Sequence, residues 1–161
     1  MKICIIYHSY SGITRGVAEK LKASCGGDLV EVKPRKDYTT LTAYTLGCRR
    51  AMKREADPVH PDSIDVSSYD IIVIGTPVWA WKATPVINGA IAALEGSEEK
   101  SAVIFVTCGG KPGETIPVLK EALSAKGVRI VGEKVFVRRD ADDPEKIGEL
   151  ASIIRSAGNT G

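Results

Sequence analysis

Hydroxyl side chains gather around a glycine close to the start of the chain, where they could bind a phosphate group. The hydroxyl residues are Ser9, Ser11 and Thr14, and the glycine is Gly12. Hydroxyl groups donate hydrogen bonds, and glycine lets the backbone curl close to a ligand. The N-terminus of a following helix would add free N–H groups and the positive end of its dipole. An ordinary strand-to-helix turn capped by a serine is the alternative interpretation.

The better-known phosphate loops do not match this stretch. The sequence contains no G-x-x-x-x-G-K-[ST], and the turn lacks the three glycines of a dinucleotide fingerprint. Any phosphate bound here would therefore be held mainly by hydroxyls and backbone amides.

Both tryptophans of the chain, Trp79 and Trp81, lie in one stretch bounded by Pro77 and Pro85. A flat aromatic ligand could stack on one of these rings. The alternative is that they cover the edge of a sheet or contact another protein, since tryptophan is enriched at interfaces.

A third stretch, residues 107–113, is rich in glycine. Gly109, Gly110 and Gly113 would let main-chain amides approach the polar edge of a heterocycle, although a plain strand-to-helix connection is equally compatible. Cys108 in this stretch resembles a redox thiol, but no second cysteine is near it in sequence. A small residue that fills space is the preferred interpretation.

These three stretches follow predicted strands, and the whole chain alternates strands with helices. The first strand is the apolar run at the start of the chain, and the others are predicted at residues 29–32, 69–75, 102–106 and 128–137, the last interrupted near Gly132. Helices are predicted from Ile13 to a stop within 23–27, and at 41–54, 86–94, 114–126 and 143–156. Residues 57–68 are predicted to form a loop, and residues 157–161 a frayed tail.

Five strands alternating with five helices predict a doubly wound α/β domain with a parallel sheet covered on both faces. Ligands of such sheets bind beyond the carboxyl ends of the strands, at the switch point. With strand order 2-1-3-4-5, the three stretches would converge on one crevice. A phosphate site, a stacking wall and an amide-lined edge together describe a mononucleotide with an extended aromatic ring, and FMN fits that outline.

Composition limits the other possibilities. A chain of 161 residues predicts a single domain, 1–161. A net charge of +2 gives no indication of nucleic-acid or membrane binding, and no apolar run is as long as a membrane span. The four cysteines show no metal-ligand spacing, so no metal site is expected, and a reduced cytoplasmic setting is predicted.

The same three stretches resemble the flavodoxin-like family. Residues 9–14, Ser-Tyr-Ser-Gly-Ile-Thr, resemble its phosphate loop, with the form hydroxyl-x-hydroxyl-Gly-x-hydroxyl. Residues 69–79 resemble its third strand and first flavin loop, and residues 107–110 its second flavin loop. The resemblance implies a five-stranded 2-1-3-4-5 sheet and non-covalent FMN. The expected cofactor-binding residues are Ser9, Tyr10, Ser11, Gly12, Ile13, Thr14, Thr76, Pro77, Val78, Trp79, Trp81, Thr107, Cys108, Gly109 and Gly110.

The chain also departs from that family. Ile13 stands where many flavodoxins have asparagine, and Arg15 directly after the phosphate loop could contact the phosphate or face water. Flavodoxins that carry electrons tend to be strongly acidic, whereas this chain is slightly basic. Its basic residues include a patch near the end of the 41–54 helix, formed by Arg49, Arg50, Lys53 and Arg54. A solvated face that suits the helix dipole is the first explanation of this patch, and a docking surface for an acidic partner the second.

Two functions follow from the resemblance. The first is an electron-transfer protein that passes electrons between protein partners, and the second is an NAD(P)H-dependent FMN oxidoreductase that acts on a quinone or another small acceptor. No catalytic residue beyond the flavin is expected, because the cofactor would carry the chemistry. Lys111, if it points inward, would favour the reduced anionic flavin. The sequence indicates neither the physiological partners nor the oligomeric state.

Overall fold

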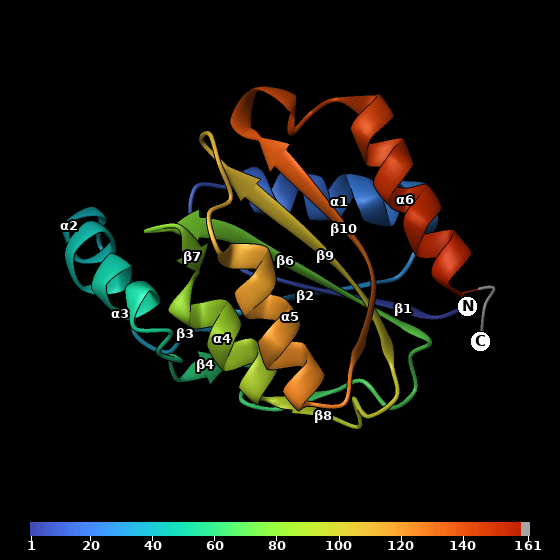
Figure 1. The fold of residues 1–161 in the computed structure, drawn as a ribbon, viewed down its shortest axis with the longest axis horizontal. Helices are drawn as coiled ribbons and strands as arrows, with labels where there is room; N and C mark the ends of the chain where they lie inside the picture. The colour runs from blue at the N-terminus through green and yellow to red at the C-terminus, as the bar shows by residue number, and fades with distance from the viewer. Residues whose placement is uncertain (159–161) are drawn as a thin grey trace.

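The fold is described from a computed structural model that places residues 1–158. Its centre is a sheet with five long strands, covered by helices on both sides (Figure 1). The strands are β1 (Ile3–Tyr7), β2 (Asp28–Glu31), β6 (Ile71–Trp79), β9 (Ser101–Cys108) and β10 (Arg129–Val137). The helices that alternate with them are α1 (Ile13–Cys25), α4 (Pro85–Ala92), α5 (Thr115–Ala125) and α6 (Pro144–Gly158).

The five strands pair in the order β2-β1-β6-β9-β10, and every pair along this path is parallel. This is the predicted order 2-1-3-4-5, and it confirms the doubly wound α/β class. The register of β10 shifts between Ile130 and Gly132, where an interruption was expected. Because β1, β6 and β9 are neighbours, the segments that follow them meet at one edge of the sheet.

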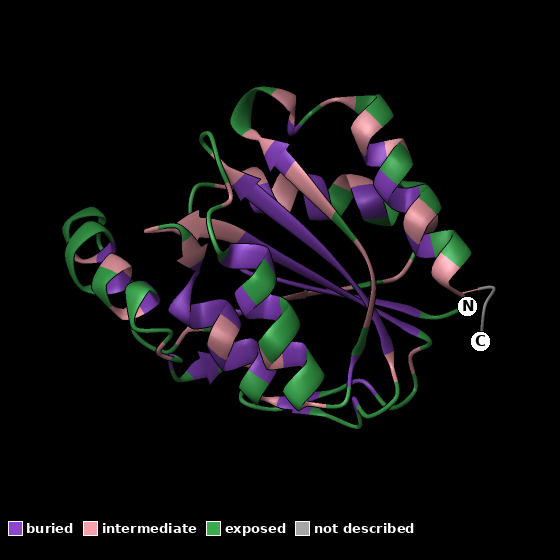
Figure 2. Ribbon diagram, in the orientation of Figure 1, coloured by how far each residue is buried: buried purple, intermediate pink, exposed green. Residues whose placement is uncertain are grey.

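Two apolar cores hold the helices against the sheet, one on each face. On one face, Val86 of α4 and Leu119 of α5 are fully buried against the sheet. On the other, Leu21 of α1 and Leu150 of α6 are equally buried. Burying each such aliphatic side chain contributes about 1.5–3 kcal/mol. Figure 2 shows the result, with buried central strands and outer helix faces that are exposed.

The third strand of the sheet is longer than predicted. β6 continues past Gly75 as far as Trp79, and a short strand β7 (Lys82–Ala83) pairs with its end. Pro77 fits within a strand because β1 has already ended beside Gly75, so no N–H is needed on that side. The predicted flavin loop is therefore largely a hairpin.

The helix predicted at 41–54 is divided into three pieces. α2 (Thr40–Thr42) leads into a π-helical turn η1 (Ala43–Gly47), and α3 (Cys48–Met52) follows. Thr42, Thr45 and Gly47 have low helix propensity, so packing rather than propensity determines the path of this segment. Figure 1 shows it projecting beside the ends of β6 and β7.

Four further strands of two residues each were not predicted. β3 (Lys33–Pro34) pairs with β4 (Val59–His60), and β5 (Ile64–Asp65) with β8 (Leu94–Glu95). Two of these lie in the predicted 57–68 loop, where such short pairings leave no periodic signal. The predicted tail was partly wrong, because α6 continues to Gly158; residues 159–161 lie outside the described part. Among the described residues, no helix is long and apolar enough to cross a membrane.

Candidate functional site

A cavity of about 300 Å³ opens where β1, β6 and β9 end. Nine of the fifteen expected residues line it: Tyr10, Ser11, Ile13, Pro77, Val78, Trp79, Thr107, Cys108 and Gly109. The other lining residues are Ala43, Tyr44, Cys48, Ala80 and Arg138. The three stretches that the sequence singled out therefore do meet at one site.

The loop between β1 and α1 is shaped by its own residues. Gly12 directly precedes α1 with a φ of 93°, a left-handed conformation that favours glycine. The Ser9 hydroxyl oxygen accepts hydrogen bonds from the backbone N–H groups of Gly12 (3.1 Å) and Arg15 (3.2 Å). Ser9 therefore does not line the cavity but holds the loop in a fixed curve.

This curve leaves donors available for an anion. The backbone N–H groups of Ser11, Ile13 and Thr14 have no hydrogen-bond acceptor among the described residues. The Ser11 hydroxyl also has no partner in the described chain. These groups surround the N-terminus of the thirteen-residue helix α1, where the dipole favours negative charge. Arg15 takes no part, because its guanidinium forms an ion pair with Glu31, which raises the pKa of Arg15.

A buried hydrogen bond ties this loop to the end of β9. The hydroxyl oxygens of Thr14 and Thr107 are 2.8 Å apart, and both side chains are buried. Thr14 therefore joins two of the three stretches and does not offer its hydroxyl to the cavity. Thr76 is likewise used internally, since its hydroxyl donates to the Pro77 carbonyl oxygen at 2.8 Å.

Trp79 forms another part of the cavity wall, and side chains from several segments contact its ring. Edge-to-face contacts join it to Tyr38 at 5.3 Å, Tyr10 at 5.6 Å and His8 at 6.0 Å between ring centroids. Such contacts each contribute about 0.5–1.5 kcal/mol beyond area burial. The ring is thus fixed by tertiary packing.

Gly47 lets the divided helical segment pack directly on Trp79. A Cβ at this position would lie 2.6 Å from Cζ3 of Trp79, closer than real Cβ atoms come, and 3.2 Å from Cε1 of Tyr38, which is a tight contact. Tyr38 in turn donates its hydroxyl hydrogen to Asp57 at 2.6 Å, and Asp57 also forms an ion pair with Arg50. The π-helical turn therefore lies where the segment meets the site, a position at which such turns are frequent.

Trp81 differs from Trp79 in that it is not part of the cavity wall. Its side chain is 67% exposed, and it does not line the cavity. Ala80 and Trp81 form the two-residue turn between β6 and β7, with φ values of 48° and 61°. Positive φ at both central residues is typical of a type I′ turn, which normally takes asparagine or glycine. The turn is held in place by a hydrogen bond from the Glu114 N–H to the Trp81 carbonyl.

The third stretch leaves open space around its glycines. A Cβ added at Gly109 or Gly110 would meet nothing within 4 Å, so a ligand can approach this backbone closely. Gly110 does not line the cavity itself, and Lys111 is exposed and is not among the lining residues. The cation that does line the cavity is Arg138, which follows directly after Val137, the register partner of Cys108.

Two cysteines, Cys48 and Cys108, are among the residues that line the cavity. Burial is the main cause that raises the pKa of both, and the nearby Asp140 carboxylate raises that of Cys108 further. Both are therefore protonated near neutral pH, which favours the space-filling interpretation of Cys108 over a reactive thiol.

His8 follows β1, is buried, and contacts the edge or face of Trp79 in a T-shaped arrangement. Its Nδ1 is 3.2 Å from the Val32 carbonyl oxygen, and burial lowers its pKa below the usual 6.5. Its Nε2 has no hydrogen-bond partner within the described chain. A neutral ring is therefore the form that this packing favours.

Three parts of the lining were not expected from the sequence: Ala80, which lies between the two tryptophans, the lining residues of the 40–52 segment, and Arg138. The only sequence signal for the 40–52 segment was an excess of apolar residues on a helix that did not need them for the main core. For Arg138 the signal was its place at the end of the fifth strand, beside the second flavin loop in the predicted sheet.

Comparison with known proteins places these loops in context. Residues 2–131 match a family model described as Flavodoxin. A protein from Bacteroides eggerthii DSM 20697, provisionally named a flavoprotein, is 27% identical with a TM-score of 0.77, over 96% of this chain and 98% of that one. A flavoprotein in complex with FMN from Lactobacillus acidophilus NCFM has 24% identity and a TM-score of 0.70, over 90% and 97%. The two-electron reduced flavodoxin of Megasphaera elsdenii has 18% identity and a TM-score of 0.61, over 98% of each chain. The comparison with curated proteins gave no match.

Proposed function

Because this chain belongs to the flavodoxin family, we propose that its cavity binds FMN non-covalently and that the protein transfers electrons. The observation that carries the proposal is the meeting of three loops around one cavity of about 300 Å³. One loop offers unpaired amides at a helix N-terminus, one contributes an aromatic ring, and one has open backbone.

The donor set suits the phosphate end of FMN. The free N–H groups of Ser11, Ile13 and Thr14 and the Ser11 hydroxyl would bind the phosphate, while Ser9 keeps their orientation. Charge-assisted hydrogen bonds of this kind are about twice as strong as those between neutral groups. A phosphate at this position would satisfy donors that nothing in the described chain satisfies.

The other end of the cavity suits a flat heterocycle. Trp79 would cover one side of the ring and exclude water, and Tyr10 and Tyr44 lie at the exposed rim. The amides from Thr107 to Gly110 would address the polar edge. Bound FMN supplies one- and two-electron redox chemistry, and the protein positions it and sets its surroundings. Arg138 provides a positive charge in the cavity wall that would favour a negatively charged ligand.

A binding titration with a thiol footprint tests the proposal. We expect the flavin-free protein to bind FMN at least about tenfold more tightly than riboflavin, which lacks the phosphate. Bound FMN should also slow maleimide labelling of Cys48 and Cys108. Cys25 lies at the far end of α1 and serves as the internal control. Equal affinity for the two flavins, or labelling unchanged by FMN, would contradict the proposed site.

The role in electron transfer has its own test. Stepwise anaerobic photoreduction of the FMN-loaded protein, followed by visible absorbance, should resolve two separate one-electron steps for an electron carrier. Rapid bleaching by NADH or NADPH would instead favour the nicotinamide-dependent reductase. We further propose the reduced, cytoplasmic setting expected from the sequence, in which the four cysteines would remain thiols.

A further inference from the structure

The outer side of the divided segment α2–η1–α3 is unusually apolar for an exposed surface. Seven large hydrophobic side chains are exposed in the described chain, and four of them belong to this segment: Leu41, Tyr44, Leu46 and Met52. Two more of the seven are close to the cavity: Tyr10 lines it, and Trp81 follows the lining residue Ala80. The seventh, Met1, lies elsewhere. Apolar side chains gathered around a site in this way indicate that another molecule covers them.

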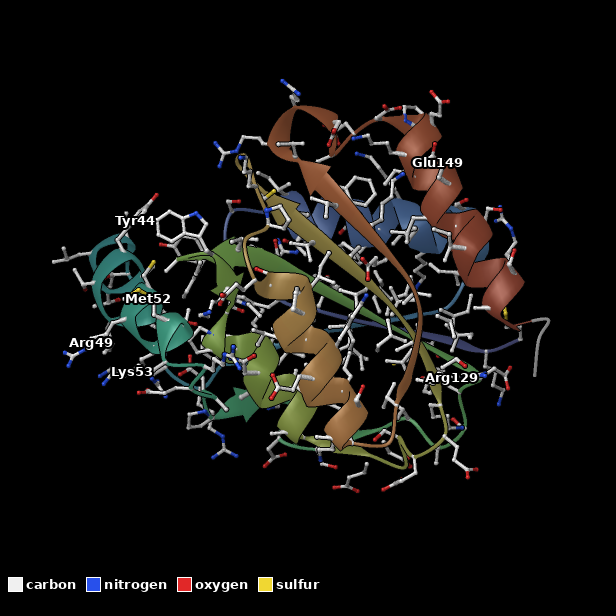
Figure 3. All side chains as sticks on the ribbon, viewed as in Figure 1. Tyr44, Arg49, Met52, Lys53, Arg129 and Glu149 are labelled. Carbon is white, nitrogen blue, oxygen red and sulfur yellow. The ribbon has the colours of Figure 1, made fainter. Side chains whose placement is uncertain are left out.

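The same segment is also positively charged. Residues 38–54 contain four basic residues and no acidic one. Arg50 is paired with Glu55 and Asp57, and Arg54 with Glu121. No carboxylate in the described chain pairs with Arg49 or Lys53, which are exposed and four residues apart. Figure 3 shows Arg49 and Lys53 pointing outward from α3, on the side away from the sheet.

These two features adjoin the cavity. Ala43, Tyr44 and Cys48 line it from the inner side of the segment whose outer side carries Arg49 and Lys53. Tyr44 belongs to both surfaces, since it lines the cavity and is 75% exposed. A protein bound to the outer face would therefore lie next to the redox site.

We propose that the face formed by Leu41, Tyr44, Arg49, Met52 and Lys53 docks a redox partner protein whose surface is acidic around its own redox centre. The inference rests on the proposed function, because it assumes that the cavity holds the flavin. Unpaired cations select an acidic surface and speed its approach, and aromatic, methionine and arginine side chains are typical of interface cores. This charge is opposite to that expected of an acidic electron-carrier flavodoxin.

The test uses an acidic plant-type [2Fe–2S] ferredoxin as the probe. FMN loading is verified first by absorbance, so failure of the proposed function is seen before any ferredoxin is added. Calorimetry then measures the affinity of oxidised ferredoxin for the FMN-loaded protein. Stopped-flow absorbance measures the rate at which reduced ferredoxin reduces the flavin. Each ferredoxin gives one electron, so two ferredoxin molecules are oxidised for each flavin that takes up two electrons.

The informative variant is Arg49→Glu/Lys53→Glu. The matched control is Lys22→Glu/Arg129→Glu, which makes the same change in net charge. Arg129 begins β10 and Lys22 lies in the last turn of α1, so both are at the opposite edge of the sheet from the cavity. Figure 3 shows Arg129 far from Arg49 and Lys53. Both variants should retain FMN and the wild-type circular dichroism spectrum.

We expect the first variant to lose about tenfold or more in affinity and in second-order rate at low ionic strength, and the control to lose little. The difference should disappear at about 0.5 M salt, where charges are screened within a few ångströms. Equal losses in both variants would assign the effect to net charge and overturn the proposal. So would unchanged affinity and rate in the first variant, or a wild-type rate that rises with salt.

Discussion

The two walls of the cavity are built in different ways. The loop of residues 9–14 is held mainly by its own hydrogen bonds, with Ser9 accepting from two N–H groups within six residues of it, and one buried hydrogen bond joins Thr14 to Thr107. The Trp79 ring is held by Tyr38, Tyr10 and His8 and by the close approach of Gly47, which lie in several separate parts of the chain. A local wall depends on few residues, whereas a tertiary wall is disturbed by a change in any segment that packs on it.

Removing the centre of the tertiary wall should have the largest effect. Trp79→Ala deletes the ring that covers the proposed flavin site and that three other aromatic rings contact. We expect FMN affinity to fall about tenfold to hundredfold, because stacking on an aromatic ring is worth about 1–3 kcal/mol. Fluorescence titration measures the change. The control is Trp81→Ala, whose ring is 67% exposed and should leave affinity nearly unchanged. The reverse ranking would assign the stacking role to Trp81.

A single methyl group should disturb the same wall from behind. Gly47→Ala places a Cβ 2.6 Å from Trp79 Cζ3, so the helical segment or the ring must move. We expect the free energy of unfolding to fall by about 1–3 kcal/mol, the usual cost of overpacking, with weaker FMN binding. Denaturant unfolding and flavin titration measure the two effects. Gly148→Ala is the matched control, because a Cβ there meets nothing within 4 Å. It should not destabilise the protein, since alanine favours a helix.

The local wall should respond in a narrower way. Ser9→Ala removes the acceptor for the N–H groups of Gly12 and Arg15, which loosens the loop by about 1 kcal/mol if it acts like other capping serines. We expect the dissociation constant for FMN to rise about fivefold while that for riboflavin is unchanged. Ser63→Ala, at a serine whose hydroxyl bonds to Glu95, is the control. A parallel loss for both flavins would show that the loop supports the whole site rather than the phosphate alone.

The smallest expected effect is a pH dependence of the unfolding free energy that comes from His8, one of the rings that contact Trp79. Burial lowers the pKa of His8 below 6.5, so the unfolded chain binds a proton more readily than the folded one. The stability that this group contributes is present above pH 6.5 and is lost as pH falls through the lowered pKa. We expect unfolding free energy to drop more between pH 7.5 and 5.5 in the wild type than in His8→Asn. An identical drop in both proteins would assign it to other groups.

The main strands and helices and the meeting of three loops at the strand ends were predictable from the sequence, and the sheet order followed from the resemblance to the flavodoxin-like family. Apolar runs predict the strands and helices, and the hydroxyl and glycine residues of 9–14 predict a phosphate-binding loop from only a few neighbouring positions. The division of the 40–52 segment into three helical pieces was not predictable. Thr42, Thr45 and Gly47 weaken an α-helix, but they do not determine which structure forms in its place. The sequence also left open which tryptophan lines the site, because Trp79 and Trp81 are the same residue type and lie two positions apart.

The tertiary structure decided these points for a physical reason. Alternation would place Trp79 and Trp81 on the same side of an extended strand, but β6 ends at Trp79 and Trp81 lies in a turn with positive φ. The turn exposes Trp81, and Gly47 closes against Trp79 from a segment more than thirty residues away. Close packing between distant segments depends on shapes that no single stretch contains. The sequence alone therefore determined the kind of site, and the packing of the folded chain decided which residues form its walls.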